Sequence, residues 1–424
     1  MFKKSTAGLL ALVLAGAAAS ALAETKVDFD QMNFSVKDIV ESVTAEKSDM
    51  QLPVSSVSEK VKGAEWTIMV FVNAKNNLEQ YCLKDLNEME MVGSTEKIQV
   101  VVELGRIKGY DSSDGDWTGS KRYLVAKDNN TSKISSPVVQ TIKKTDMGDY
   151  KHLVDFAKWA KTNYPAKRYM LIVWNHGSGW TMQSAVNLKG ISYDDESGNH
   201  ITTEQLGAAL KEIGKVEIYG SDACLMQMPE VDYEIKDSVD YIVGSEETEP
   251  GDGYTYNTFL EKANASDMTP LAVGKAAVNA YTEHYANAGE GATQSLVKAS
   301  ALAGFVQALD AWTEAVIASG DKTAVKNAAK SALSFAYADN KDLNHFVSLV
   351  NASISGADAK AKGKALMDYL AAELVKHNKT ASSQFADAAG LAIYVPNSYN
   401  GNYDELAFAK ESKWPAFIKW LAAD

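Results

Sequence analysis

Short apolar runs alternate with amphipathic stretches from residue 66 to about residue 245. Runs of branched apolar and aromatic residues predict buried strands, and apolar positions three and four residues apart predict helices between them. Strands joined by helical crossovers predict a mostly parallel sheet covered by helices on both faces, a three-layer α/β/α sandwich. The expected strands are 66–72, 98–104, 169–174, 216–219 and 241–244, with helices at 77–91, at 150–163, after a capping box formed by Thr202 and Gln205, and directly after Cys224.

The pattern changes at about residue 268. Alanine-rich helical patterns run from there to Thr380, and an apolar segment at 390–395 predicts a last strand. We therefore expect an α/β core at 63–267, followed by a helical C-terminal region at 268–424. We expect the strand 390–395 of that region to return to the sheet of the core.

The N-terminus has the pattern of a secretory signal peptide over residues 1–23. Lys3 and Lys4 precede an apolar run, and the small residues at Ala21 and Ala23 form a cleavage site. The apolar run is too short and too rich in alanine for a good membrane span. We therefore expect an exported protein, periplasmic or extracellular, without a membrane span in the mature chain. Residues 24–62 are polar and poor in aromatic residues, which indicates a leader or pro-segment.

Charge and composition narrow the classes of partner. The formal net charge is −13, which argues against binding to nucleic acid and to anionic membrane surfaces. The hydrophobic share of 46% allows a large core. We expect a monomer with protein or peptide partners.

The chain contains two cysteines, Cys82 and Cys224, in different contexts. Pairing them in a disulfide is one interpretation, because exported proteins form such bonds. However, Cys82 shares a helical face with Leu78, Leu86 and Met89, which is typical of a small core residue. Cys224 instead follows an apolar strand and precedes a predicted helix, at a place where reactive residues are often found.

Two expected strands run directly into candidate catalytic residues. The strand 169–174 is followed by His176, and the strand 216–219 leads to Cys224. If these strands are neighbours, their carboxyl ends bring the two side chains together, so that His176 could act as the base that activates the Cys224 thiol. A helix starting just after Cys224 would lower the thiol pKa further. The N–H groups of Gly177 and Cys224 could then form an oxyanion hole. The alternative for His176 is a loop histidine with a hydrogen-bonding role.

Several segments together match the pattern of a known family. They are Trp66–Val70, Asp85–Glu90, His176–Trp180, Asp222–Met226 and Val243–Gly253, with weaker support from Gly390–Tyr394 and Trp414. In these segments the sequence resembles the clostripain family of cysteine peptidases, which is related to caspases, legumain and gingipains, and the resemblance covers most of residues 65–260. Two positions depart from the family pattern: Lys75 stands where the family usually has Asp, and Asn175 replaces an Asp that is common before the histidine.

The resemblance implies a caspase-like sheet, a catalytic dyad of Cys224 and His176, and cleavage after Arg or Lys. A basic side chain needs a carboxylate in its pocket. Asp222, two residues before the nucleophile, matches the family's acidic specificity residue, and Asp252 is a second candidate; the alternative for each is a role in a turn. The family also implies self-processing. We expect the cut in the loop 181–199, which has no regular pattern, after Lys189, the only Lys or Arg between Trp180 and Lys211.

The sequence also bears on cofactors and on functions other than peptide cleavage. No cofactor is required by a thiol mechanism, and no metal ligands are assigned. Some members of the family need calcium, but the acidic segments 111–116 and 194–196 do not have the spacing of an EF-hand loop and are better explained as solvated turns. Two other functions remain open: a non-catalytic binding protein on the same fold, and a transpeptidase or ligase that uses the same dyad.

Overall fold

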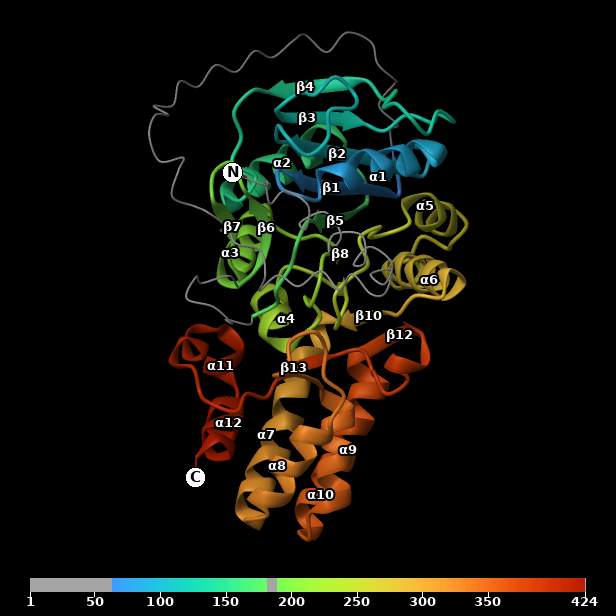
Figure 1. Ribbon diagram of the computed structural model, residues 1–424. Coiled ribbons are helices and arrows are strands. Elements are labelled where there is room, and N and C mark those ends of the chain that lie inside the picture. The colour runs from blue at the N-terminus through green and yellow to red at the C-terminus, as the bar shows by residue number, and fades with distance from the viewer. Residues whose placement is uncertain (1–62, 181–188, 424) are drawn as a thin grey trace, which may run out of the picture. The chain divides into compact units, whose positions relative to one another are not determined.

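The computed structural model describes residues 63–180 and 189–423, and these residues are built around one nine-stranded sheet (Figure 1). The strand order is β12-β10-β9-β8-β5-β1-β2-β3-β4. Strands β9, β8, β5, β1 and β2 run parallel. Strand β10 is antiparallel to its neighbours β9 and β12, and strand β3 is antiparallel to its neighbours β2 and β4. The strands are β1 Trp66–Ala74, β2 Ile98–Arg106, β3 Gly119–Leu124, β4 Val138–Ile142, β5 Arg168–Trp174, β8 Ile218–Asp222, β9 Tyr241–Gly244, β10 Ala292–Lys298 and β12 Val375–Ala381.

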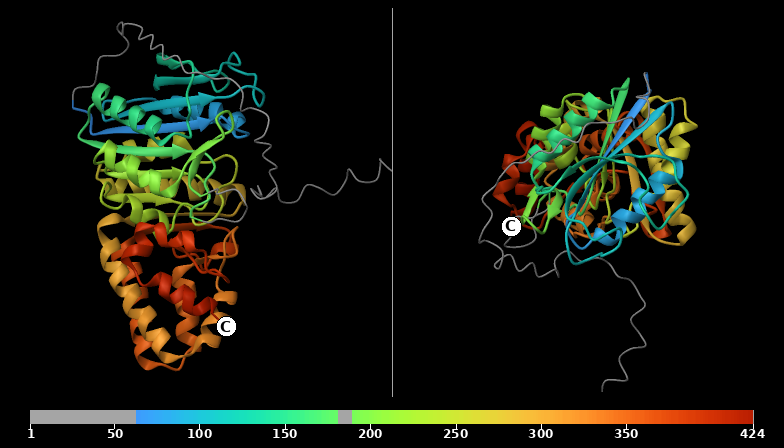
Figure 2. Two further views of the ribbon diagram at one scale, coloured as in Figure 1. Left: turned by 90° about the vertical axis from the view of Figure 1, so that its left-hand side faces the viewer. Right: turned by 90° about the horizontal axis from the view of Figure 1, so that it is seen from above.

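Helices cover both faces of this sheet, so the predicted three-layer sandwich is confirmed (Figure 2). The residues of β1 and β2 are buried at every position, because a parallel sheet between two helical layers has no solvent-facing side. One layer consists of α1 Glu79–Val92, α5 Tyr256–Asn264 and α6 Pro270–Ala288, and the other of α2 Tyr150–Asn163, α3 Thr203–Ile213 and α4 Pro229–Ile235.

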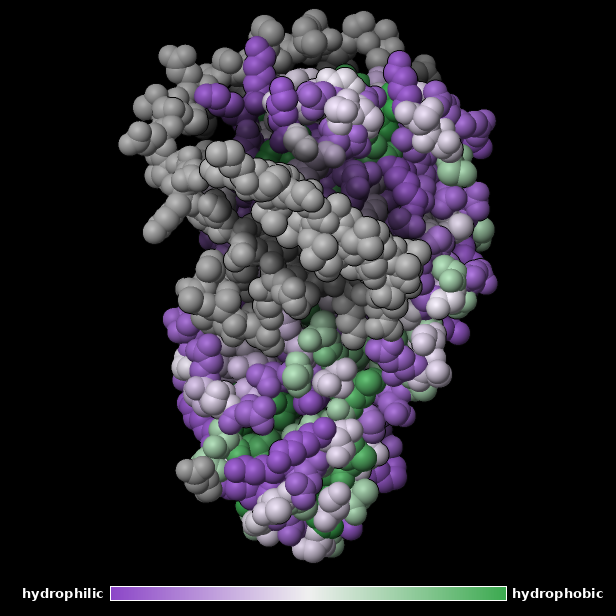
Figure 3. Space-filling view, in the orientation of Figure 1, coloured by the Kyte–Doolittle hydropathy of each residue, from purple (hydrophilic) through white to green (hydrophobic). Residues whose placement is uncertain are grey.

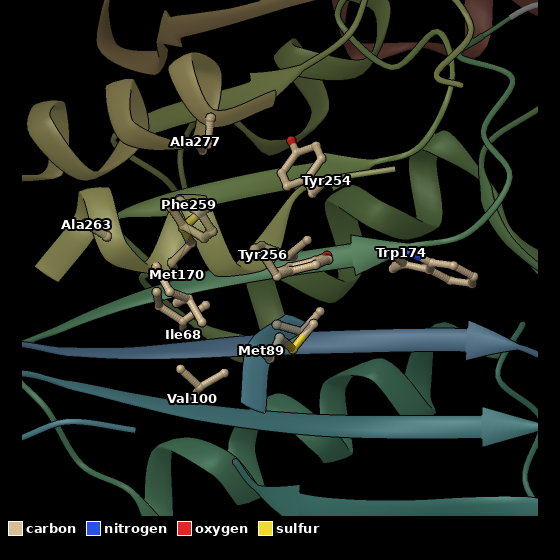
Figure 4. Packing of buried hydrophobic residues seen from close by; sticks show 14 of the residues in the cluster. Ile68, Met89, Val100, Met170, Trp174, Tyr254, Tyr256, Phe259, Ala263 and Ala277 are labelled. Atoms are coloured by element: carbon tan, nitrogen blue, oxygen red, sulfur yellow. The ribbon is translucent and has the colours of Figure 1, made fainter. Parts of the chain in front are cut away.

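The main hydrophobic cluster fills the space between the sheet and the layer of α1, α5 and α6. Figure 4 shows Ile68 of β1 and Met170 of β5 beside Phe259 of α5. Trp174, at the end of β5, is part of the same cluster and donates a hydrogen bond from its indole N–H to the Asp85 carboxylate at 2.7 Å. This buried hydrogen bond fixes the end of β5 to α1.

The helical C-terminal region also contributes to the sheet. It supplies β12, the strand at one edge, and β10, the strand next to it. Its longer helices α7 and α10 pack together, and α9 contacts both α8 and α10. Besides α6, which covers the sheet, the helices of this region are α7 Leu302–Ser319, α8 Lys322–Ser331, α9 Leu343–Ser353, α10 Ala357–Tyr369, α11 Ala407–Glu411 and α12 Trp414–Ala422, with a π-helical turn at Leu370–Leu374 and short 3-10 turns at Ala299–Ala301, Ser383–Phe385 and Gly401–Glu405.

The expected return of residues 390–395 to the main sheet is wrong. The strand there, β13 Ala392–Tyr394, pairs with β11 Asn340–Asp342 in a separate two-stranded sheet. The strand that does return is β12, which lies where the helical pattern was expected to continue to Thr380. The sequence of β12, VKHNKTA, is polar and mostly half-buried because it forms the edge of the sheet, so it lacks the apolar run that marks the inner strands.

One helix of the C-terminal region is long and apolar enough to cross a membrane by length and composition. It covers Ala299–Ser319, and half of its most apolar window is buried inside the protein. Helix α7 within it packs against α10 and α12, which is the ordinary situation of a core helix.

Large exposed hydrophobic side chains are few among the described residues. They are Met91, Tyr110 and Val138, which belong to α1, to the loop after β2 and to β4. Over the C-terminal helices, Figure 3 shows hydrophilic and hydrophobic side chains mixed on the face that it draws. The described residues thus carry their exposed large hydrophobic side chains singly, as is common on protein surfaces.

Candidate active site

The carboxyl ends of β5 and β8 lie side by side. The two strands are parallel neighbours, with Trp174 opposite Asp222 in the register. The N–H of Asn175 then donates to the Asp222 carbonyl at 3.2 Å, which keeps the chains together beyond the strands. His176 and Cys224 each follow two residues after their strand. The predicted neighbourhood of the two loops is confirmed.

Gly177 lies directly against the backbone of Cys224. A Cβ atom at position 177 would be only 2.5 Å from the Cys224 carbonyl oxygen, so only glycine allows this close approach. Among the described residues, neither the Gly177 N–H nor the Cys224 N–H donates to a backbone carbonyl. These two N–H groups thus have no backbone acceptor within the described residues, at the place where the oxyanion hole is expected.

The Cys224 thiol is neutral at rest. The residue is 8% exposed, and burial, with the nearby charges of Glu249 and Glu247, raises the pKa of the thiol to about 12. Its sulfur accepts one hydrogen bond, from the Glu249 N–H at 3.3 Å. The expected helix directly after Cys224 is wrong: α4 begins only at Pro229, because Leu225 with a φ of 64° turns the chain out of a helical path. The helix terminus therefore does not lower the thiol pKa.

His176 is also neutral. It is 4% exposed, and burial lowers the pKa of its imidazole to about 3. Its Nε2 atom lies 2.6 Å from Oδ1 of Asn77, in the segment between β1 and α1. The sequence reasoning quoted Asn77 only as part of a family motif and gave it no role. Its position after β1, the other neighbour of β5, was the signal that could have found it.

Asp222 lies deep in the site with its carboxylate well satisfied. Its Oδ1 accepts from the Tyr254 N–H at 3.1 Å, and its Oδ2 accepts from the Tyr256 hydroxyl at 2.7 Å. Burial raises the pKa of this carboxyl to about 6. Burial and the charge of Asp222 also raise the pKa of Glu249, and burial raises that of Asp85 with Asp222 as the next cause. Several buried acids thus interact around Asp222.

Asp252 is at the rim and is already paired. Its side chain is 47% exposed and lies 2.8 Å from the ammonium group of Lys84 on α1. Gly253, the next residue, has a φ of 58° and would place a Cβ 2.9 Å from the Asp222 carboxylate. The loop therefore brings Asp252 to the same side of the molecule as Asp222, in a more solvated setting.

Lys189 makes contacts of its own. Its ammonium group lies 2.6 Å from the Glu204 carboxylate and 5.0 Å from the centre of the Trp180 ring, and its side chain is 11% exposed. Residues 181–188 of the expected cleavage loop lie outside the described residues. The hairpin after it, β6 Ile191–Asp194 with β7 Asn199–Ile201, falls in the segment that was expected to be irregular.

The acidic segments are occupied by internal contacts. Asp194 lies 3.3 Å from the Lys75 ammonium group, and its oxygens accept backbone N–H groups at 2.9–3.1 Å. Asp111 accepts from the Ser113 N–H at 2.7 Å. Within residues 63–180 and 189–423, no group of three His, Cys, Asp or Glu side chains is arranged to hold a metal ion.

Both cysteines are free, so the disulfide interpretation is wrong. Cys82 is buried on α1, as expected for a core residue, and its thiol donates to the Glu79 carbonyl at 3.0 Å. Burial raises the pKa of the Cys82 thiol well above its usual range.

Known proteins with related sequences and folds include cysteine peptidases. The sequence model of the Clostripain family matches residues 70–420. The clostripain of Hathewaya histolytica is 28% identical over 239 residues, which cover 51% of this chain and 45% of that protein, so the chain spans less than half of this curated relative.

Two solved structures share the fold. A secreted C11 cysteine protease from Bacteroides thetaiotaomicron, in complex with an irreversible peptide inhibitor, has a TM-score of 0.64 and 20% identity, covering 84% of this chain and 99% of that one. An inactive zymogen C11 protease from Parabacteroides distasonis has a TM-score of 0.60 and 18% identity, covering 82% and 98%. The predicted caspase-like fold is confirmed. Because the family model matches most of its length, the chain belongs to the clostripain family of cysteine peptidases.

Proposed function

We propose that the protein is a cysteine endopeptidase that cleaves after Arg or Lys, with Cys224 as the nucleophile and His176 as the general base. The observation that carries this proposal is the pairing of β5 with β8. Because these strands are neighbours, His176 and Cys224 each lie two residues beyond adjacent strand ends. The neutral state of both groups fits a mechanism in which the thiol proton moves during the attack.

The reaction would proceed through a thioester. The Cys224 sulfur bonds to the scissile carbonyl carbon while its proton passes to His176, and the N–H groups of Gly177 and Cys224 hold the resulting oxyanion. The C–N bond then breaks as His176 returns the proton to the leaving amine. Water, deprotonated by the same imidazole, hydrolyses the acyl-enzyme and restores the thiol. The mechanism requires no cofactor; a calcium requirement, which some members of the family have, is tested by comparing activity in calcium and in chelator.

Basic specificity is supported by the cluster of buried acidic side chains around Asp222. A guanidinium or ammonium group entering beside this carboxyl would favour its ionised form and form charge-assisted hydrogen bonds. Asp252 would assist from the rim. Its present partner Lys84 shows that an ammonium group fits against this carboxylate at 2.8 Å.

The decisive test is a panel of fluorogenic peptides with Arg, Lys, Asp, Asn or Leu before the cut, incubated with wild type, Cys224→Ala and His176→Ala. We expect cleavage after Arg and Lys and losses of several orders of magnitude in both variants. Cys82→Ala is the matched control and should keep activity. Activity in Cys224→Ala, or best cleavage after Asp or Leu, would contradict the proposal. Ligated products with an added amine would instead indicate a transpeptidase, and binding without turnover a non-catalytic relative.

Export and self-processing belong to the same proposal. Residues 1–23 would direct export to the periplasm or beyond, and the chain would cut itself after Lys189. Because Lys189 is now held by Glu204 and Trp180, cleavage there requires this side chain to leave its contacts. Mass spectrometry of wild type beside Cys224→Ala tests the step. Fragments ending at Lys189 only in the wild type are expected, and an active wild type that stays intact there would refute it.

A further inference from the structure

We propose that Asn77 is a positioning residue of the active site, whose carboxamide oxygen fixes the tautomer and the orientation of the His176 imidazole. This inference rests on the proposed function. Its starting point is the distance of 2.6 Å between Nε2 of His176 and Oδ1 of Asn77. A contact this short between a buried ring and a half-buried amide is a directed hydrogen bond.

The contact decides which ring nitrogen carries the proton. The carboxamide oxygen of Asn77 has no hydrogen to give, so Nε2 of His176 must be the donor. A neutral imidazole has one N–H, and Nδ1 is then the nitrogen that can accept a proton. General-base catalysis by His176 therefore has to use Nδ1, and Asn77 keeps this atom unprotonated.

Asn77 is held in place by the chain on both sides. The neighbouring Asn76 accepts from the Leu78 N–H at 2.9 Å and donates to the Tyr193 carbonyl at 2.8 Å. Lys75 donates to the Thr145 carbonyl at 2.5 Å and pairs with buried Asp194. Thus Lys75, the departure from the family pattern, anchors the segment that presents Asn77.

The contacts that hold Asn76 also extend to the loop that carries His176. The Tyr193 carbonyl that binds Asn76 also accepts from the side chains of Asn73 at 3.0 Å and Asn175 at 3.2 Å. Asn73 is the last residue but one of β1, and Asn175 precedes His176. Three amides on one carbonyl therefore tie the Asn77 segment and the His176 loop to the same point of β6.

The neutrality of Asn77 also matters for pH. Burial is the one cause that lowers the pKa of His176, and no charged group of the described residues contributes. The neighbouring strand β8 leads to Cys224, and Lys75, which is paired with Asp194, directly precedes Asn76. A carboxylate at position 77 would stabilise the imidazolium and raise the pKa of His176.

The test uses full-length protein and a matched pair elsewhere in the chain. His377 and Asn279 form the same kind of contact at 2.7 Å, between β12 and α6. We expect Asn77→Ala to lower kcat by about 10- to 100-fold with little change in KM, as for partial loss of general-base catalysis. Asn279→Ala should leave kcat unchanged. Asn77→Asp should keep much of kcat at high pH and move the acidic limb of the kcat profile upward by about one pH unit or more.

A second readout does not depend on activity. Long-range proton–nitrogen NMR spectra of histidine-labelled protein, assigned with His176→Gln, should show a neutral His176 ring protonated at Nε2 and a mixture of tautomers in Asn77→Ala. A folded Asn77→Ala with unchanged kcat and an unchanged ring would overturn the inference, and so would an acidic limb in Asn77→Asp that stays in place. If the wild type cleaves no peptide, the proposed function fails, while the spectra still decide the tautomer.

Discussion

At the scale of single residues, the two reactive groups are neutral. Sequence reasoning expected a thiol activated by His176 and by a helix terminus, but burial raises the pKa of Cys224 to about 12 and lowers that of His176 to about 3. Between these values the thiol keeps its proton and the imidazole has none. Alkylation of Cys224 by iodoacetamide, followed in Cys82→Ala, should therefore rise with pH to above 9, because the thiolate is the reacting form. A plateau reached at mildly acidic pH would show a resting ion pair instead.

Asp222 and Asp252 should differ in their weight for specificity. Asp222 is buried, whereas Asp252 is half exposed and already paired with Lys84. We expect Asp222→Asn to lower kcat/KM for Arg peptides by about 100-fold or more, since a buried charge without its partner costs several kcal/mol. Asp252→Asn should cost less than about tenfold, as for exposed pairs. Equal losses, or the larger loss in Asp252→Asn, would reverse this assignment.

Because Asp222 is titratable, the preference for Arg peptides over neutral peptides should depend on pH. Burial raises this pKa to about 6, so the carboxyl is ionised above that value and protonated below it. The ratio of kcat/KM for an Arg peptide to that for a neutral peptide should grow as the pH rises through about 6 and should lose this dependence in Asp222→Asn. A ratio independent of pH in the wild type would contradict it.

At the scale of elements, helices and strands with a clear local pattern could be predicted from the sequence, whereas those that depend on tertiary contacts could not. The helix 150–163 and the capping box at Thr202 are observed as predicted, because periodicity and caps are local signals. Strand β12 was missed because an edge strand with one exposed side can be polar. The helix after Cys224 was placed too early because a positive φ at Leu225 leaves no mark in the sequence. Asn77, which contacts His176, lies in the segment after β1, so this contact depends on strand order, which local patterns do not contain.

A buried charge network joins the three elements β2, β3 and α2. Glu103 of β2 binds Arg122 at 2.7 Å, Ser120 of β3 at 2.7 Å and His152 of α2 at 2.5 Å. Burial alone would raise the pKa of Glu103, but His152 and Arg122 lower it to about 2.

We therefore expect Glu103→Gln to lower the free energy of unfolding by about 3–5 kcal/mol, because it leaves buried cations without their partner. In the wild type, the contribution of a depressed carboxyl pKa is complete above about 4.5 and is lost as the pH falls toward about 2. Urea unfolding at several pH values measures both effects. A Glu103→Gln protein as stable as the wild type at pH 7 would show that the network contributes nothing. Asp155→Asn, which removes the exposed partner of Arg122, is the control with a small expected effect.

At the scale of the whole molecule, the C-terminal region is part of the site's support. The Gly390 N–H donates to Glu246 at 3.0 Å, and the Ala336 N–H donates to Glu247 at 2.9 Å. The carbonyl of Glu247 in turn accepts from the Leu225 N–H at 3.1 Å, next to Cys224. The division at residue 267 therefore separates sequence patterns, while the sheet and the loop around Cys224 draw on both sides of it. This sharing could not be predicted from composition, because the contacts join residues far apart in the chain.

The central claim is that Cys224 is the nucleophile of a peptidase with basic specificity. The most direct measurement is peptide mapping by mass spectrometry after reaction of the full chain with a peptidyl-lysine chloromethyl ketone. The account predicts one adduct, on Cys224, with Cys82 unmodified, and a much slower reaction for the matching peptidyl-aspartate reagent. An adduct on Cys82, equal reaction of the two reagents, or a protein that cleaves Arg peptides while Cys224 stays unmodified would contradict it.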